Sequence, residues 1–303
     1  MLAADAAYAW GPAMHVALGN SVLGQLALVP AGIATILARH ALAYLYGNIA
    51  ADIVFAKRLS RVKQFCHHWS TGLAVLNSAR DDRAKAFAYG YLSHLAADTV
   101  AHGKFVPRQI TLSDCSVNFG HFYWELRADS VQPNEVWRLV ETVIGDDHEA
   151  HHIELSSHLT DTLLSYEVNR LLFERMNALA VRRGFRKTLD TWSRYSRYPL
   201  PPLVMSGYHN ECVDRILSIL SQGSRSPLLR EDPNGSSAIM NVKFQRRHAR
   251  RMRRDACMTD QRRREVVYGW APQPAARTFD LLPGPQAAAS GSRPAALAAA
   301  CAR

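Results

Sequence analysis

The stretch Tyr91-Leu-Ser-His-Leu-Ala-Ala-Asp-Thr-Val-Ala-His102 carries polar side chains at regular intervals in an otherwise apolar run. His94, Asp98 and His102 recur every four residues, so on an α-helix they lie along one side. His121 and Glu125 repeat the same four-residue step further along the chain. Buried polar groups need partners, and imidazole and carboxylate groups are the ligands that zinc takes in hydrolytic sites. The pattern therefore predicts a metal centre held by helices.

The composition is that of a globular protein with a basic end. Of the 303 residues, 48% are hydrophobic and 20% are charged, which is enough to form a sizeable core. Residues 1–223 carry 21 Lys and Arg against 20 Asp and Glu, whereas residues 224–303 carry 15 against 6. The formal charge of +10 therefore comes mainly from the second segment. This charge distribution gives little support to nucleic-acid binding, because a binding face should belong to the folded part of the chain.

Helical spacing dominates up to residue 223, and no convincing alternation typical of strands is present. We expect an all-α bundle over residues 10–223 with a metal site in a central cleft. Gly103 and Pro107 are expected to end the helix that carries His94, and residues 185–205 are expected to form a loop. The predicted helices cover 13–28, 31–46, 61–78, 82–104, 119–130, 133–153, 158–184 and 206–222.

The segment 224–303 is expected to be a disordered, basic tail. Its Ala, Pro, Gly and Arg residues bury too little apolar surface to offset the entropy of an ordered chain. An alternative reading of its Arg-rich stretch, Arg246 to Arg264, is an arm that binds an anionic surface or nucleic acid. Elsewhere, the five cysteines form no Cys-x-x-Cys pair, and no apolar run is long enough to span a membrane.

Further candidate ligands lie upstream of the central stretch. Asp52 is a lone carboxylate in an apolar helical segment, and His15 lies near the N-terminus. His67 and His68 are adjacent, so only one of them can face a common site from a helix; His68 is the expected outward partner. Residues 146–152 also contain histidines and acids, but a charged, solvated helix end is the favoured interpretation there.

These motifs resemble the zinc-dependent phospholipase C family, whose fold is shared with fungal single-strand-specific nucleases. The resemblance covers most of residues 10–130 and keeps the family order. The matching stretches are Trp10-Gly-Pro-x-x-His15, Tyr46-Gly-Asn-Ile-Ala-Ala-Asp52, His67-His-Trp69, Gly90 to His102, and His121-x-x-x-Glu125.

The resemblance implies two or three zinc ions in an all-helical cleft. Asp52, His67, His94 and Asp98 would bind one ion, and His102, His121 and Glu125 would bind a second. A third would use His15, the other oxygen of Asp98, and the amino and carbonyl groups of Trp10 as the first residue of the mature chain.

The residues before Trp10 bear on this last ligand. Ala7-Tyr8-Ala9 is typical of the end of a signal peptide, although no basic and apolar segments precede it in residues 1–9. We therefore expect residues 1–9 to be a signal-peptide remnant or a disordered N-terminus. Cleavage there would create the amine of Trp10 and place the protein in the periplasm or outside the cell. An uncleaved chain would be cytoplasmic and would lack that ligand.

The implied activity is zinc-dependent hydrolysis of a phosphodiester, with Asp52 orienting or deprotonating the attacking water. A phospholipid head group is the favoured substrate, and Trp192, Tyr195 and Tyr198 in the 185–205 segment are candidates for contact with a membrane surface. The alternatives are a single-strand nuclease, which would need aromatic and basic groove residues, and a non-catalytic zinc-binding protein.

Overall fold

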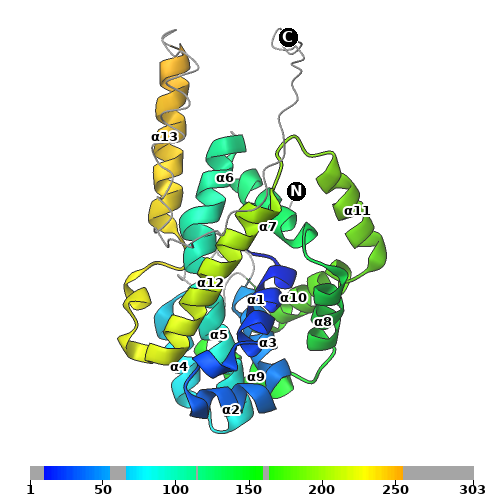
Figure 1. Cartoon of the computed structure of the whole chain (residues 1–303), viewed down its shortest axis with the longest axis vertical. Helices are drawn as coiled ribbons and strands as arrows, with labels where there is room; N and C mark the ends of the chain where they lie inside the picture. The colour runs from blue at the N-terminus through cyan, green and yellow to red at the C-terminus, as the bar shows by residue number, and fades with distance from the viewer. Residues whose placement is uncertain (1–9, 55–65, 114, 160–163, 255–303) are drawn as a thin grey trace, which may run out of the picture.

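The structure is a computed structural model that describes residues 10–54, 66–113, 115–159 and 164–254. Within these ranges it is all-α and contains no strand, as the sequence predicts (Figure 1). None of the described helices has the length and apolar character needed to cross a membrane. The helices of the first half are α1 (Pro12–Leu23), η1 (Leu26–Leu28), α2 (Ala31–Arg39), α3 (Ala41–Ala50), η2 (Ala51–Ile53), α4 (Trp69–Ser78), α5 (Asp82–Val100), η4 (Ala101–Phe105), α6 (Val106–Ser113) and α7 (Val117–Ser130).

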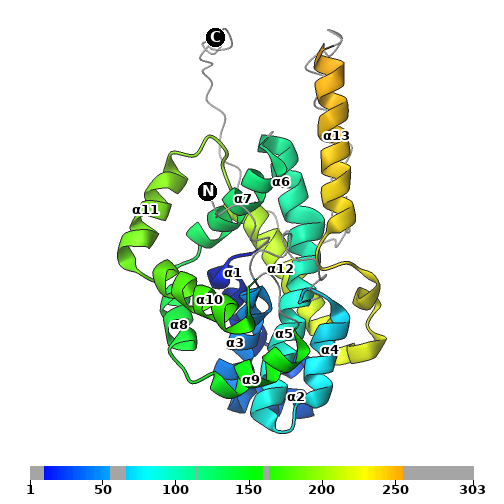
Figure 2. The ribbon, with the colours of Figure 1, turned by 180° about the vertical axis from the view of Figure 1, so that it is seen from behind.

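The helices of the second half flank the first, with α8, α10 and α11 on one side and α13 on the other (Figure 2). Its helices are α8 (Asn134–Ile144), α9 (Glu149–His158), α10 (Tyr166–Ala180), α11 (Arg183–Arg194), α12 (Pro202–Gln222), η5 (Gly223–Arg225), η6 (Pro227–Arg230) and α13 (Ser236–Arg254).

Helix α5 lies at the centre of the molecule, with α1, α3, α4 and α12 packed around it. Nearly every side chain from Ala86 to Val100 is buried, as expected of a helix that is apolar on all sides. Two glycines let α3 approach α5 closely. A Cβ atom on Gly47 would lie 2.1 Å from the carbonyl oxygen of Phe87, and one on Gly90 would lie 2.0 Å from that of Tyr44. Because neither glycine has a side chain, α3 and α5 can pack at this short distance beside the predicted metal site.

The predicted end of this central helix at Gly103 and Pro107 is wrong. The chain continues through η4, a π-helical turn, directly into α6. Pro107 is the second residue of α6, the helix that directly follows this turn. The turn contains His102, and such π-helical insertions occur frequently at functional sites because they change the direction of a side chain.

Several other predicted boundaries also differ from the structure. The range 31–46 is divided between α2 and α3 at His40, and α4 begins only at Trp69, where the side chain of His68 accepts a hydrogen bond from the amide of Ser70. The remainder of the predicted helix 61–78, residues 61–65, lies outside the described residues. The range 133–153 corresponds to α8 and the first half of α9, and the range 158–184 to α10 with the first residues of α11; residues 160–163 lie outside the described residues.

The predicted loop at 185–205 is largely helical, because most of it belongs to α11 and the start of α12. Trp192 packs edge-on against Tyr123, with ring centroids 4.8 Å apart, and Tyr195 is exposed. Tyr198 instead donates a hydrogen bond to the carbonyl of Ser113 at 2.8 Å. Of the three aromatic residues expected at a membrane surface, Trp192 and Tyr195 are the more accessible.

The prediction of disorder is wrong for residues 224–254. This segment forms η6 and the long helix α13, and it returns to the body of the protein before α13 begins. The indole of Trp69 donates a hydrogen bond to the carbonyl of Glu231, and the side-chain amide of Asn234 donates one to the carbonyl of His67. These tertiary contacts are not visible in a composition average. Residues 255–303 of the predicted tail lie outside the described residues.

Residues 146–152 form a solvated helix end only in part. Asp147 and Glu149 are exposed at the start of α9, as their charge predicts, whereas His148, His151 and His152 are buried. His152 bridges two phenols, with its Nε2 atom 2.7 Å from the hydroxyl of Tyr46 and its Nδ1 atom 2.9 Å from that of Tyr166. The ring of His148 stacks on Tyr46 at 3.5 Å. The cluster is therefore a packed, aromatic part of the core.

Acid should destabilise the protein through this cluster. Burial, followed by the charge of His148, lowers the pKa of His151 from 6.5 to about 4. The unfolded chain then binds more protons between these values, so the free energy of unfolding falls as the pH drops through that window. His151→Phe keeps a ring against Phe87 but cannot titrate. In urea denaturation, the variant should lose less stability than the wild type between about pH 7 and about pH 5. An equal loss in both proteins would contradict this account.

Candidate metal centre

The predicted ligands come from separate elements and converge in the interior. α1 supplies His15, η2 supplies Asp52, and His67 lies just before α4. The central helix supplies His94 and Asp98, the π-helical turn supplies His102, and α7 supplies His121 and Glu125. All eight side chains are buried. The predicted outward orientation of His68 is confirmed, since this residue is exposed.

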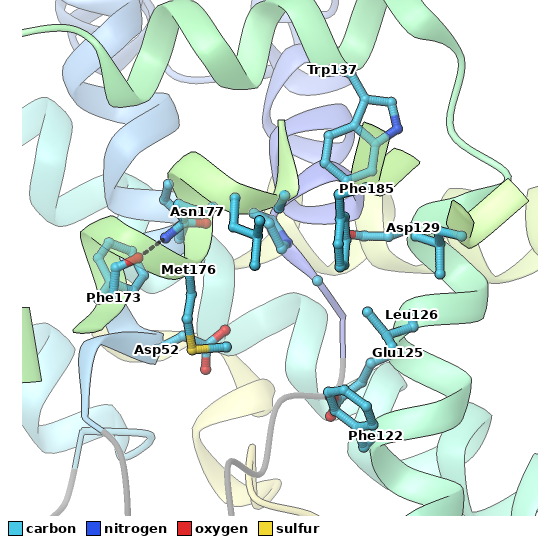
Figure 3. A pocket seen from close by; sticks show the side chains of 16 residues that line it. Asp52, Phe122, Glu125, Leu126, Asp129, Trp137, Phe173, Met176, Asn177 and Phe185 are labelled. Carbon is cyan, nitrogen blue, oxygen red and sulfur yellow. Dashed lines mark hydrogen bonds between the residues drawn. The ribbon is translucent and has the colours of Figure 1, made fainter. Parts of the chain in front are cut away.

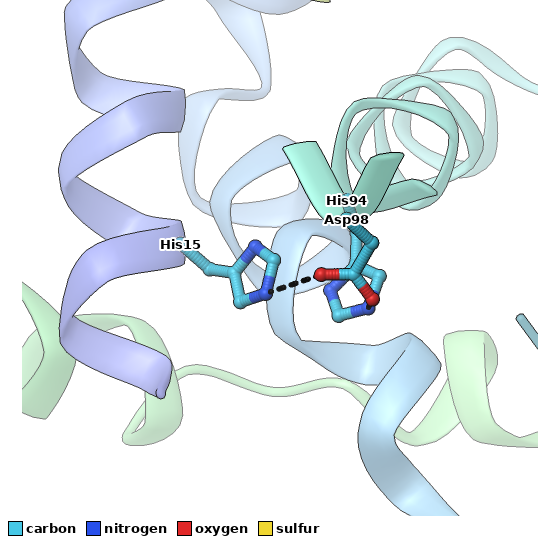
Figure 4. A group of neighbouring side chains, drawn as sticks. All are labelled: His15, His94 and Asp98. Atoms are coloured by element: carbon cyan, nitrogen blue, oxygen red, sulfur yellow. Dashed lines mark ion pairs between the residues drawn. The ribbon is translucent and has the colours of Figure 1, made fainter. Parts of the chain in front are cut away.

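The carboxylate of Asp98 lies at the centre of this group. Its Oδ1 atom faces the Nε2 atom of His15 at 3.5 Å, across the gap between α1 and α5 (Figure 4). Its Oδ2 atom faces the Nε2 atoms of three other histidines: His94 at 3.1 Å, His67 at 3.2 Å and His102 at 3.5 Å. The two oxygens thus serve two different sets of imidazoles, which is the arrangement of a bridging carboxylate.

A second carboxylate completes the set on the other side of His67. Asp52 approaches the Nε2 atom of His67 to 3.0 Å and that of His94 to 3.9 Å. The two imidazole Nε2 atoms are themselves 3.1 Å apart. A tetrahedral zinc ion about 2.0–2.1 Å from each ligand holds neighbouring ligand atoms roughly 3.3 Å apart. The donor atoms of Asp52, His67 and His94, and those of His67, His94 and Asp98, therefore have close to the spacing that a common cation requires.

Hydrogen bonds alone do not satisfy this arrangement. The Nδ1 atom of His94 lies 2.8 Å from the backbone carbonyl of Asn48, so in the neutral ring this nitrogen carries the proton. The Nε2 atom then presents a lone pair toward the carboxylate of Asp98, which is also an acceptor. Two facing acceptors repel each other, whereas a cation between them accepts electrons from both. A carbonyl that fixes the tautomer in this way is typical of the surroundings of metal-binding histidines.

His121 and Glu125 form an adjoining pair on α7. The Nε2 atom of His121 lies 3.2 Å from a carboxylate oxygen of Glu125, and its ring meets that of His102 edge-on, with centroids 4.9 Å apart. His102 also faces Asp98, so it lies between this pair and the central group. The predicted second set of ligands is therefore adjacent in space, with His102 shared between the two groups.

The charges of the central residues suit the binding of a cation. Burial and the proximity of His94 lower the pKa of His15 from 6.5 to about 3, so His15 is neutral near pH 7. Burial alone would raise the pKa of Asp98, but His94 and His102 outweigh it and hold that pKa well below its usual value. Metal ligands must be deprotonated, and both residues meet this requirement.

Trp10, the first of the described residues, lies in the core. Its indole is fully buried, with its ring centroid 4.5 Å from that of Phe105. The amine expected to bind a third ion would exist only in a chain that begins at this residue. Residues 1–9, which include the expected cleavage motif, lie outside the described residues.

Sequence reasoning missed Asp129, which holds the start of α1 in place. This buried carboxylate on α7 accepts hydrogen bonds from the amides of Ala13 at 3.2 Å and Met14 at 2.9 Å. Burial raises its pKa to about 7, against the lowering effect of those two amides. A Cβ atom on Gly11 would lie 2.2 Å from the carboxylate. Its position four residues after Glu125 continues the spacing of His121 and Glu125, and this signal could have revealed it.

Removal of this carboxylate should destabilise the protein measurably. Asp129→Ala leaves two amides at the start of α1 without their acceptor, which should lower the free energy of unfolding by about 0.5–2 kcal/mol. Asp129→Asn retains one oxygen and should lose less. Glu141→Ala, at an exposed position on α8, should stay within about 0.5 kcal/mol of the wild type in the same denaturation experiment. If Asp129→Ala is as stable as this control, the carboxylate does not anchor α1.

An apolar cavity of about 270 Å³ opens beside the predicted ligands. Asp52 and Glu125 contribute to its walls from two different sides, and Asp129 and Asn177 are its other polar side chains (Figure 3). The remaining lining is mostly aliphatic and aromatic, and comes mainly from α7, α10 and α11: Phe122, Leu126, Trp137, Phe173, Met176, Leu179, Ala180, Phe185 and Leu189. The carboxylates thus connect the buried ligand group with a space of suitable size for part of an apolar molecule.

Comparison with known proteins agrees with this geometry. Residues 14–180, more than half of the chain, match the family model described as zinc dependent phospholipase C. The chain belongs to the zinc-dependent phospholipase C family. The matched range includes every predicted ligand except Trp10, together with most of the residues that line the cavity. No match was found among curated proteins or among solved structures.

Membership of this family and the clustered His and Asp donors indicate zinc as the cofactor. Three overlapping groups of donors meet the spacing of a metal site among the described residues: His15, His94 and Asp98; Asp52, His67 and His94; and His67, Asp98 and His102. Imidazole nitrogen and carboxylate oxygen are a donor set that zinc accepts at tetrahedral sites.

Proposed function

We propose that this zinc-dependent phospholipase C family protein hydrolyses the phosphodiester bond of a phospholipid. The observation that carries the proposal is the contact between the donor group and the apolar cavity. Asp52 belongs to both, because it faces His67 at 3.0 Å and also lines the cavity. A substrate in the cavity would therefore present its phosphate to the ligand group while its apolar part is withdrawn from water.

The ligand assignment is part of this proposal. One zinc ion would be held by Asp52, His67, His94 and Asp98, and a second by His102, His121 and Glu125. His15 and the other oxygen of Asp98 would hold a third, with Trp10 as a further ligand in a chain that begins there. Bound zinc supplies an activated water and a Lewis acid for the phosphoryl group. A chain that begins at Trp10 after cleavage of a signal peptide would be exported to the periplasm or out of the cell.

The protein's own residues would position the reactants. Asp52 lies where the cavity meets the donor group, so its carboxylate would orient the attacking water and accept its proton. The aliphatic wall, including Leu126, Met176 and Leu189, would exclude other water and hold the apolar portion of the substrate. A nuclease would need stacking aromatic groups beside cationic side chains, whereas no Lys or Arg lines this cavity among the described residues.

Adjacent histidines provide a matched test of the ligand assignment. His67→Ala should lose zinc after dialysis, because its imidazole faces Asp52, His94 and Asp98 together. His68→Asn changes the neighbouring, exposed position and retains a side chain that can accept the amide of Ser70 at the start of α4. It should keep the zinc content of the wild type, measured by atomic absorption. Equal zinc content in both variants would contradict the assignment.

The substrate class is tested through the wall of the cavity. Met176→Gln places a polar side chain of similar length in the aliphatic wall, at a partly exposed position that should tolerate it. We expect kcat/KM for phosphatidylcholine to fall about ten-fold, the equivalent of about 1.4 kcal/mol of lost apolar contact. Hydrolysis of the water-soluble p-nitrophenylphosphorylcholine should change little.

Parallel assays of the wild type separate the possible activities. Phosphatidylcholine, a glycosylphosphatidylinositol and single-stranded DNA would each be offered to the zinc-loaded protein. Cleavage of a phospholipid, and none of DNA, is the expected result. Cleavage of DNA alone would identify a nuclease, and the absence of any cleavage by protein with full zinc content would indicate a non-catalytic zinc-binding protein.

A further inference from the structure

Helix α13 lies at one edge of the molecule (Figures 1 and 2). It runs beside α6 and extends beyond the end of that helix in both views (Figures 1 and 2). Its inner side is held by Ile239 and Val242, which are buried where α13 packs against η4 and α6. The sequence of α13 contains seven Lys or Arg residues and no acidic residue. The local charge of this one helix is therefore strongly positive, whereas residues 1–223 are close to neutral.

The outward side of α13 combines apolar and basic residues. Met240 and Phe244, one helical turn apart, are 67% and 70% exposed. Lys243, Arg247 and Arg251 are also exposed and follow one another at the same four-residue step. Residues with this spacing form adjacent stripes on a helix. An apolar stripe beside a cationic one, both facing away from the core, has the pattern of helices that lie at a membrane surface.

The base of α13 rests on the backbone of two predicted ligands. The side-chain amide of Asn234 donates a hydrogen bond to the carbonyl of His67 at 2.8 Å. Gly235 has a φ of +59°, and a Cβ atom there would lie 2.3 Å from the carbonyl oxygen of His102. Asp232 fixes this connection, since its carboxylate accepts hydrogen bonds from the amides of Asn234 and Ser236. The helix is thus attached rigidly to the candidate metal centre.

We propose that α13 is a docking element for an anionic lipid surface. Exposed Lys243, Arg247 and Arg251 would meet the negative head groups, and Met240 and Phe244 would enter the boundary between head groups and acyl chains. Charge complementarity selects an anionic surface over a neutral one. The exposed apolar pair favours a lipid over a nucleic acid, because a phosphate backbone offers no apolar phase for these side chains.

This inference goes beyond the proposed hydrolysis, because it concerns where the protein docks rather than what it cleaves. Attachment at Asn234 and Gly235 would hold the metal centre at a fixed place relative to the surface. Binding can therefore be measured in the presence of a chelator, where no hydrolysis takes place. Failure of docking and failure of catalysis would then be seen in separate experiments.

The test uses the full chain and co-sedimentation with vesicles of phosphatidylcholine, with or without phosphatidylglycerol. The wild type should bind the anionic vesicles much more tightly than the neutral ones, and salt should weaken the binding. Each cation near such a surface contributes roughly five-fold to binding. The triple variant Lys243→Glu, Arg247→Glu, Arg251→Glu should therefore lose about 100-fold or more.

A matched control reverses three exposed cations on other elements: Arg39→Glu on α2, Arg80→Glu before α5 and Arg175→Glu on α10. The change in net charge is the same, so any loss specific to α13 reflects its surface rather than overall charge. Circular dichroism and thermal unfolding would verify that both variants are folded. Equal binding of the two triple variants to anionic vesicles would overturn the proposal.

A second variant distinguishes a lipid surface from other possible binding partners of α13. Met240→Ser with Phe244→Ser keeps every charge and should weaken vesicle binding about ten-fold. Unchanged vesicle binding in this variant, together with tight binding of single-stranded RNA that the charge reversal abolishes, would identify a nucleic-acid arm and overturn the proposal. Self-association of the wild type that this variant abolishes would identify a second copy as the occupant, with the same consequence.

Discussion

Four imidazoles turn toward the buried carboxylate of Asp98, and the segments that carry them come from distant parts of the sequence. Burial of an ionised carboxylate is costly unless compensating charges and hydrogen bonds surround it. The side chains of His15, His67, His94 and His102 surround it from α1, the segment before α4, α5 and η4, and a cation held among these donors would supply the compensating charge. The arrangement is stable only if all these segments keep their places, so the packing of the helices and the chemistry of the site depend on each other.

The packing shows how this condition is met. Gly47 and Gly90 let α3 and α5 approach until the carbonyl of Asn48 reaches the imidazole of His94. On the opposite side, Asp129 fixes the first turn of α1 through the amides of Ala13 and Met14, and His15 directly follows them. These contacts determine the tautomer of one histidine and the position of another. They hold the donors in place, and pre-organisation of this kind reduces the cost of binding the metal.

The sequence predicted much of this site because the relevant information is local. Four-residue spacing within an apolar helix places His94 and Asp98 on one side whatever the rest of the fold does. What could not be predicted depends on tertiary contacts. Burial of His152 between two phenols overrides the charge of its neighbours. The π-helical turn at His102 replaces the end that Gly103 and Pro107 indicated.

The basic end of the described chain illustrates the same limit. Its composition predicted disorder, and averaging over eighty residues concealed the two buried side chains, Ile239 and Val242, that fasten α13 to the body. The hydrogen bonds of Asn234 and Trp69 join segments more than a hundred residues apart. Helix α13 would be poorly stable alone and is therefore ordered by its contacts with the segments that carry the predicted metal ligands. These contacts join an exposed helix to the buried donor group.

Crystals of the zinc-loaded protein, with anomalous diffraction data collected on both sides of the zinc absorption edge, would test the central claim most directly. The account predicts a zinc peak enclosed by Asp52, His67, His94 and Asp98, about 2.0–2.2 Å from the donor atoms. Zinc found only at surface histidines, with the rings of His67 and His94 turned away from Asp98, would contradict it.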